Sequence, residues 1–195
     1  MALRLGVVDL ETTGLSQQQG HRIIEVGFAM FKTDNGKDFT KMGSTLSKRI
    51  NPKREIDQKA FDVHGIALSD LAHCETWEMF APKMGKLVKA CDILVAHNAA
   101  FDLPFIGGEF ERVGVDYGDC EMFCTMESGR FATAMGRVPS LKALCWSFGV
   151  EYDEEEAHSA AYDVDRTALC LFAGLSQGLY QIDTLSRLEG LALAS

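Results

Sequence analysis

The sequence contains no long apolar run and no excess of positive charge. None of its apolar stretches approaches the roughly 20 residues that a bilayer-spanning helix needs. The N-terminus leads directly into an apolar, strand-like segment and lacks the pattern of a secretory signal. These absences predict a cytoplasmic protein with no membrane association.

The cysteines do not form a paired motif. Zinc sites and redox centres place cysteines in C-x-x-C pairs, and no such pair occurs here. The sequence therefore predicts free thiols rather than a zinc site or a disulfide framework. The six cysteines are Cys74, Cys91, Cys120, Cys124, Cys145 and Cys170.

The charge balance is acidic, with a formal net charge of −9. A protein that gains its affinity by neutralising many phosphates is basic. Any contact with nucleic acid is therefore expected to be short and local. The small basic cluster between Lys48 and Arg54 is either a groove lining or an ordinary solvated surface.

The length of 195 residues suits one compact domain with a sizeable core. Dense apolar segments predict three strands at residues 3–10, 22–31 and 42–50, joined as an antiparallel meander. Helical periodicity then alternates with one further short strand, which predicts a layered α/β domain over residues 1–175. The predicted helices span residues 76–89, 98–113, 141–148 and 159–174, and the strand spans residues 92–96.

Two boundaries carry more specific expectations. Asn98 is predicted to cap the helix that follows it. Residues 176–195 are weakly patterned, and they form either a short helix packed on the body or a partner-binding tail.

Two acids lie at the end of the first predicted strand. Asp9 and Glu11 follow a dense apolar run, and residues two apart in a strand point to the same side. Burying both carboxylates is costly unless a cation compensates their charge. A hard divalent cation is the natural partner of such oxygen ligands.

Two more acids and a histidine lie at other predicted helix starts. Asp102 follows the strand at residues 92–96, and Asp163 lies near the start of the last helix. His158 is five residues before Asp163, which corresponds to about 140° of rotation on a helix. His158 must therefore lie on the loop before the helix if both serve one site. A histidine on such a loop suits a general base.

These segments resemble the motifs of the DEDD exonuclease superfamily, in its histidine-type branch. Val8–Gly14 is similar to the D-x-E-T-T-G motif, His97–Asp102 to H-N-x-x-F-D, and His158–Asp163 to H-x-x-x-x-D. Val63–Ile66 is similar to a further element near the terminal nucleotide. The tyrosine-type branch has a tyrosine where this sequence has Ser159.

The resemblance implies an RNase H-like single domain with a five-stranded mixed sheet flanked by helices. It also implies hydrolysis of the terminal phosphodiester at the 3′ end, which releases 5′-mononucleotides. Two divalent cations, Mg²⁺ or Mn²⁺, would be the cofactors, and His158 would accept a proton from the attacking water. The implied metal ligands are Asp9, Glu11, Asp102 and Asp163.

The resemblance further implies a set of substrate-binding residues and several partners. The substrate-binding residues would be Thr12, Thr13, Gly14 and His64. The partner would be the 3′ end of a nucleic acid, with single-stranded DNA favoured over RNA. A polymerase that supplies the strand and a homodimer are both compatible with the branch, which includes proofreading subunits of replicative DNA polymerases.

Two other classes of function stay open on the sequence alone. The first is a non-catalytic module that binds a nucleic-acid end or a polymerase, although such a binder has no need for four clustered acids. The second is a metal-dependent phosphohydrolase that acts on nucleotides.

Overall fold

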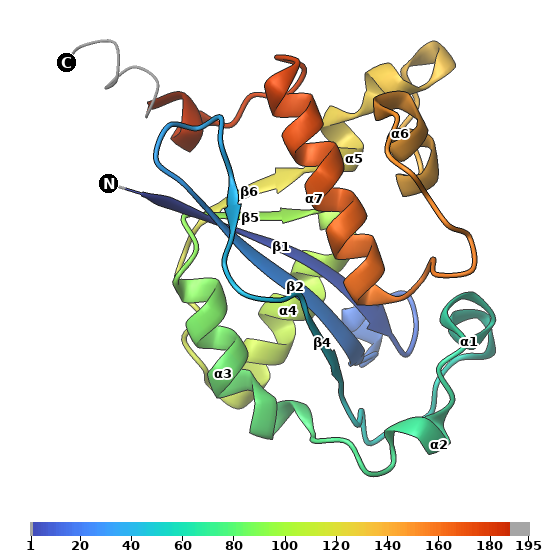
Figure 1. Cartoon of the computed structure of the whole chain (residues 1–195). Helices are drawn as coiled ribbons and strands as arrows, with labels where there is room; N and C mark the ends of the chain where they lie inside the picture. The colour runs from blue at the N-terminus through green and yellow to red at the C-terminus, as the bar shows by residue number, and fades with distance from the viewer. Residues whose placement is uncertain (1, 188–195) are drawn as a thin grey trace.

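A twisted mixed sheet forms the centre of the protein. The structure is a computed structural model that describes residues 2–187 (Figure 1). The strands are β1 (Leu3–Thr12), β2 (Ile23–Thr33), β3 (Thr40–Lys41), β4 (Leu46–Arg49), β5 (Ile93–Ala96) and β6 (Glu121–Cys124).

The order across the sheet is β3-β2-β1-β5-β6, and β4 also pairs with β2. Strand β2 runs antiparallel to β1, β3 and β4, whereas β5 is parallel to both β1 and β6. Because β3 and β4 share one side of β2, the six strands make a sheet five positions wide. The predicted fold class is confirmed.

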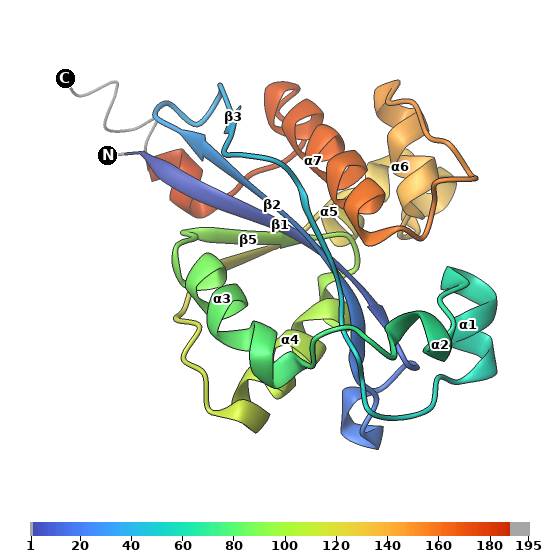
Figure 2. The same ribbon diagram turned by 60° about the horizontal axis from the view of Figure 1, so that its bottom comes forward.

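Helices cover both faces of this sheet. In Figure 2, α3 and α4 lie on one face, and α5, α6 and α7 lie on the other. Helices α1 and α2 lie beyond one end of the sheet. The α-helices are α1 (Gln58–His64), α2 (Leu68–Leu71), α3 (Trp77–Lys89), α4 (Ala99–Val113), α5 (Thr125–Ser128), α6 (Leu141–Phe148) and α7 (Ala160–Ser176). The described residues also form short 3₁₀ turns at η1 (Gln17–Gln19), η2 (Arg130–Ala132) and η3 (Ala134–Gly136).

Strand β1 contributes to the core on both of its faces. Leu5 and Val7 pack in the cluster that includes α7, whereas Val8 and Leu10 pack in the cluster that includes α3 and α4. Burial on both faces explains why β1 is apolar at nearly every position. Because alternate residues of a strand face the same side, Asp9 and Glu11 lie on the same side of the sheet as Val7, which is the side that α7 covers.

The predicted third strand was wrong in its length. In the predicted range, the strand that pairs with β2 is Leu46–Arg49, and Thr40–Lys41 pairs with β2 just before that range. Met42 and Ile50 each donate one further backbone hydrogen bond to β2. Gly43 has a φ of +80° between the two pieces. This left-handed conformation interrupts the extended backbone.

Asn98 occupies the N-cap position of α4, as predicted. Its side chain makes no capping hydrogen bond, so the expected capping interaction is absent. Its φ of 75° places the residue in the left-handed region instead. The chain turns sharply there between β5 and α4.

The segment after α7 returns to the body of the protein. Tyr180, Ile182 and Leu185 are buried in the cluster that packs against α7, and residues 183–187 are helical. The remainder of the weakly patterned segment, residues 188–195, lies outside the described residues. Within residues 2–187, every helix is too short or too polar to cross a membrane.

All six cysteines are free thiols, as predicted. Cys91, Cys145 and Cys170 are buried, and the others are partly buried.

The first turn of α7 lies directly on β2 at Gly27. A Cβ atom added to Gly27 would lie 2.1 Å from the carbonyl oxygen of Ala160. We therefore expect Gly27→Ala to lower the free energy of unfolding by about 1–3 kcal/mol, because α7 must shift away from the sheet. Urea denaturation measures this change.

Gly107→Ala is the matched control, because Gly107 is inside α4 and its added Cβ would meet only the Tyr117 hydroxyl at 3.4 Å. We expect this variant to be at least as stable as the parent protein, since alanine favours a helix by about 1 kcal/mol over glycine. Equal stability of the two variants would contradict the close approach of α7 to β2.

Candidate active site

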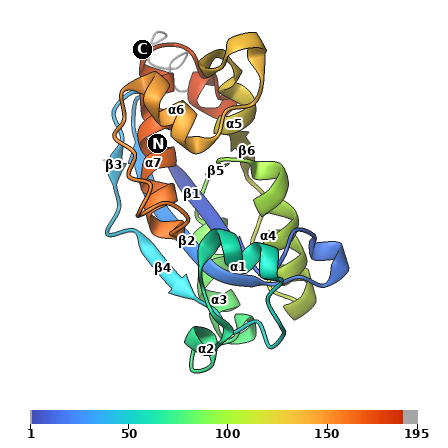
Figure 3. The ribbon, with the colours of Figure 1, turned by 90° about the vertical axis from the view of Figure 1, so that its right-hand side faces the viewer.

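A cavity of about 860 Å³ lies where β1, α1, α4, α6 and the start of α7 come together. In Figure 3, α6 and α7 are above this region and α1 is below it. The lining includes all but one of the residues predicted for the site: Asp9, Glu11, Thr12, Gly14, His64, Asp102, His158 and Asp163. The exception is Thr13.

Three of the predicted residues form a tight group. Ligand atoms of Glu11, His158 and Asp163 all lie within 4.8 Å of one another. Glu11 comes from the end of β1, and Asp163 comes from the first turn of α7. His158 lies on the loop before α7, as its spacing predicted, and it is exposed.

The backbone of His158 orients Asp163. His158 has a φ of 61°, a left-handed conformation that is uncommon for a residue with a side chain. Its backbone N–H donates a hydrogen bond to Oδ2 of Asp163, with a distance of 3.2 Å. The second carboxylate oxygen, Oδ1, is buried and has no hydrogen-bond partner among residues 2–187.

Burial raises the pKa values of all four acids, and repulsion from neighbouring acids raises those of Asp9 and Glu11 further. Burial raises the pKa of Asp9 well above its usual value, and the charges of Asp102, Asp163 and Glu11 raise it further. Burial and the charge of Asp163 raise the pKa of Glu11 to about 9. Burial raises the pKa of Asp102 to about 8, although nearby backbone N–H groups oppose this shift. Burial also raises the pKa of Asp163.

These residues fit a divalent cation. Like-charged carboxylates hold protons when no cation neutralises them. The donor set is rich in carboxylate oxygens, which hard cations such as Mg²⁺ prefer. The buried, unpaired Oδ1 of Asp163 provides a free ligand atom within this set.

The sequence and fold comparisons identify a family. The family model described as an exonuclease, RNase T, matches residues 7–171. This chain belongs to that exonuclease family. The DNA polymerase III subunit epsilon of Rickettsia typhi is 31% identical over 202 residues, which cover 98% of this chain and 84% of the relative. Ribonuclease T of Vibrio vulnificus is 32% identical over 182 residues, which cover 87% of this chain and 82% of the relative.

The fold of this exonuclease also resembles that of Escherichia coli exonuclease I in complex with a dA16 oligonucleotide. The TM-score is 0.75 at 18% sequence identity. The match covers 98% of this chain but only 43% of the exonuclease I chain. The predicted family and the predicted class of enzyme are confirmed.

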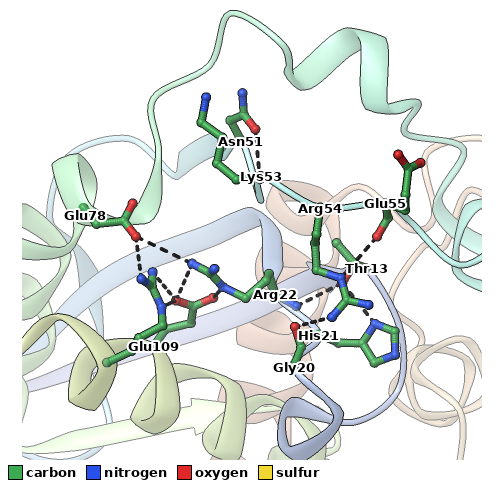
Figure 4. Close-up of polar contacts among 11 residues, drawn as sticks. Thr13, Gly20, His21, Arg22, Asn51, Lys53, Arg54, Glu55, Glu78 and Glu109 are labelled. Carbon is green, nitrogen blue, oxygen red and sulfur yellow. Dashed lines mark hydrogen bonds and ion pairs between the residues drawn. The ribbon is translucent and has the colours of Figure 1, made fainter.

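Thr13 of the exonuclease is a buried anchor for the turn after β1. Its hydroxyl lies 3.1 Å from Nδ1 of His21 and accepts a hydrogen bond from the backbone N–H of Arg22 at 3.0 Å (Figure 4). Its carbonyl oxygen accepts from the backbone N–H of Asp57. Because the Thr13 side chain is fully buried, Thr13 does not line the cavity, whereas its neighbours Thr12 and Gly14 do.

An ion-pair network centred on the buried Glu109 fixes the helix that carries Asp102. Glu109, two turns further along α4, is 2% exposed and accepts hydrogen bonds from Arg22 and Arg112. Arg112 also pairs with Glu78 of α3. The network ties α4 to the chain just before β2, and so it holds the start of α4 near the end of β1.

Two lining histidines have different environments. Nδ1 of His64 accepts a hydrogen bond from the backbone N–H of Ile66 at 3.0 Å, so Nε2 carries the proton in the neutral ring. Burial lowers the pKa of His64. Nδ1 of His97 lies 3.1 Å from the Thr125 hydroxyl, and burial lowers the pKa of His97 to about 4. Both rings are therefore neutral at pH 7.

The sequence analysis did not predict the positively charged side chains that line the cavity. Lys59 of α1 and Lys142 of α6 line it, and Lys142 forms an ion pair with Glu154 on the loop that carries His158. Neither lysine belongs to a motif, so no sequence signal separates them from surface lysines.

We expect the metal-free protein to lose stability as the pH rises from about 5 to about 9. The raised folded-state pKa values of Glu11 and Asp102 mean that the folded state binds more protons than the unfolded state over this range. Each such proton contributes a loss of up to about 1.4 kcal/mol per pH unit. Urea denaturation in EDTA at several pH values measures this slope.

Mn²⁺ should restore more stability at pH 8.5 than at pH 5.5, since cations and protons compete for the same oxygens. Glu11→Gln should flatten the pH dependence, because the variant lacks one of the titrating groups. A metal-free stability that stays constant or increases with pH would contradict the assigned cluster.

Proposed function

We propose that this protein is a metal-dependent 3′–5′ exonuclease that releases 5′-mononucleotides from single-stranded or frayed DNA ends. The observation that carries the proposal is the grouping of Glu11, His158 and Asp163 in the lining of a large cavity. Asp9 and Asp102 line the same cavity. Membership of the exonuclease family supports the same assignment.

The acids would act as the metal ligands. Asp9, Glu11, Asp102 and Asp163 would hold two Mg²⁺ or Mn²⁺ ions, which supply Lewis-acid stabilisation of the attacking and leaving oxygens. Asp9 is central to this set, because the other three acids each raise its pKa. The carboxylates come from β1, α4 and α7, which are rigid elements rather than loops.

His158 would act as the general base. Its exposed ring lies beside Glu11 and Asp163, so it can reach both solvent and the cluster. The water oxygen bonds to the terminal phosphorus while the water proton moves to His158. The bond between phosphorus and the 3′-oxygen of the preceding nucleotide breaks, which releases the 5′-mononucleotide.

The cavity favours a short stretch of a flexible strand as the substrate. Its lysines are Lys59 and Lys142, and one of them already pairs with an acid. Few phosphates can therefore be neutralised at once, in agreement with the net charge of −9. Relatives named for a DNA polymerase subunit support DNA as the preferred substrate.

RNA is the second candidate substrate, because other relatives are named Ribonuclease T. Weak intrinsic affinity would suit a polymerase partner that supplies the strand. The polymerase partner, the homodimer and the cytoplasmic location stay predictions.

We expect His158→Ala to lower kcat by about 10²–10⁴-fold, the usual contribution of a general base. Release of labelled mononucleotides from an oligonucleotide in Mg²⁺ or Mn²⁺ measures kcat. His73→Ala is the matched control, because His73 is exposed in the segment between α2 and α3. Full activity of the His158 variant would exclude this histidine as the base. A parent protein that removes nucleotides from the 5′ end, or none at all, would contradict the proposed function.

We expect single-stranded DNA to be hydrolysed faster than RNA of the same sequence. We also expect kcat/KM to fall only weakly with salt, with a slope of about −1 in log units, because one or two phosphates of a single strand are neutralised. Rate measurements on matched oligonucleotides between about 0.05 and 0.2 M salt test both points. Faster hydrolysis of RNA would reassign the substrate and leave the exonuclease activity intact.

A further inference from the structure

A fifth acid is buried beside the cluster. Glu25 lies on β2 directly opposite Glu11 in the strand register, and it is 5% exposed. Within the described part of the chain, Glu25 is not among the residues that line the cavity. Its position therefore differs from that of the four proposed metal ligands.

Both carboxylate oxygens of Glu25 have partners. Oε2 accepts a hydrogen bond from the backbone N–H of Ala160, the first residue of α7, with a distance of 3.3 Å. Oε1 accepts from the Ser47 hydroxyl at 3.3 Å and lies 3.7 Å from Nε of Arg49. Ser47 and Arg49 both belong to β4. Glu25 thus connects the edge of the sheet to the N-terminus of α7.

Glu25 replaces a local cap for α7. The first N–H groups of a helix have no partner within the helix, and the N-cap side chain usually accepts from one of them. Ser159 occupies the N-cap position of α7, but its side chain makes no capping hydrogen bond. The acceptor for Ala160 instead comes from a residue 135 positions earlier in the sequence.

The same part of β2 also limits how close α7 can approach. Gly27 and Glu25 are two residues apart, so they face the same side of the sheet. Gly27 contacts the carbonyl of Ala160, while Glu25 accepts from its N–H. The first turn of α7 is therefore fixed at two adjacent points on β2.

This double attachment determines where the catalytic side chains lie. Asp163 is in the first turn of α7, and His158 is two residues before Ala160. Glu11 is on the neighbouring strand, opposite Glu25. A shift of α7 along or away from β2 would therefore change the distances from Glu11 to both Asp163 and His158.

We propose that Glu25 is a positioning residue that holds the start of α7 on β2, so that Glu11, Asp163 and His158 stay within reach of one metal centre. The inference deepens the proposed function and rests on it. Glu25 acts through Ala160, and its side chain is not among those that line the cavity.

The test compares the parent protein with Glu25→Ala. We expect Mn²⁺ affinity, measured by isothermal titration calorimetry, to fall about 10–100-fold, which is the usual effect of losing a residue that supports metal ligands. The Mn²⁺ concentration for half-maximal activity should rise by the same factor and kcat should fall, while KM for the oligonucleotide at saturating Mn²⁺ stays within about twofold.

Glu121→Ala is the matched control. Glu121 is also a strand glutamate that accepts backbone N–H groups at the start of a helical segment, those of Asp183 and Thr184, but it does not line the cavity. We expect both variants to lose stability, and only Glu25→Ala to lose Mn²⁺ affinity. An equal loss of Mn²⁺ affinity in both variants, or none in Glu25→Ala, would overturn the proposal.

If Glu25→Ala does not fold, Glu25→Gln is used for the same measurement. Glutamine keeps one oxygen that can accept from Ala160, so we expect a smaller loss of Mn²⁺ affinity, of at least threefold, because Arg49 now faces a neutral group. Unchanged affinity would overturn the proposal. If the parent protein binds Mn²⁺ but shows no nuclease activity, the proposed function fails, and the calorimetry still tests the role of Glu25.

Discussion

Repulsion among buried carboxylates is the constraint on which the rest of the structure depends. Burial raises the pKa of Asp9, and the charges of four other acids raise it further: Asp102, Asp163, Glu11 and Glu25. Such a group can ionise fully only when cations neutralise it. The acids repel one another, so other contacts of the fold must bring them together and hold them in place.

Contacts outside the cavity supply that restraint. Helix α7 is fixed to β2 through Gly27 and Glu25, while α4 is fixed through the buried pair of Glu109 and Arg22. Thr13 closes the turn after β1 through hydrogen bonds to its neighbours. Each restraint acts on the element next to a proposed ligand, so the ligands keep free oxygens such as Oδ1 of Asp163.

The parts of the site that follow from local rules could be predicted from the sequence. Strand β1 could be predicted because a strand that is buried on both faces is apolar at nearly every position. The two-residue period of a strand then placed Asp9 and Glu11 on one side. The spacing of His158 and Asp163 required a loop before the helix.

Helix α1 was not predicted, because Gln58–His64 has no buried residue and hence no apolar periodicity. Strand β6 was not predicted either, because it is four residues long and only Phe123 in it is buried. Glu25 has the pattern of an ordinary strand residue, and its role depends on its contact with Ala160, which is distant in the sequence.

The same constraint links stability to function. Without a cation, the cluster lowers the stability of the folded state as its acids ionise, whereas bound cations remove this cost. The strained backbone of His158 lies on the exposed loop at the rim of the cluster. Its hydrogen bond to Asp163 joins that loop to the acid core. Ordering of the acids by cations should therefore also order the base, because both depend on the first turn of α7. This coupling explains how an exposed loop can carry a residue whose position must be accurate.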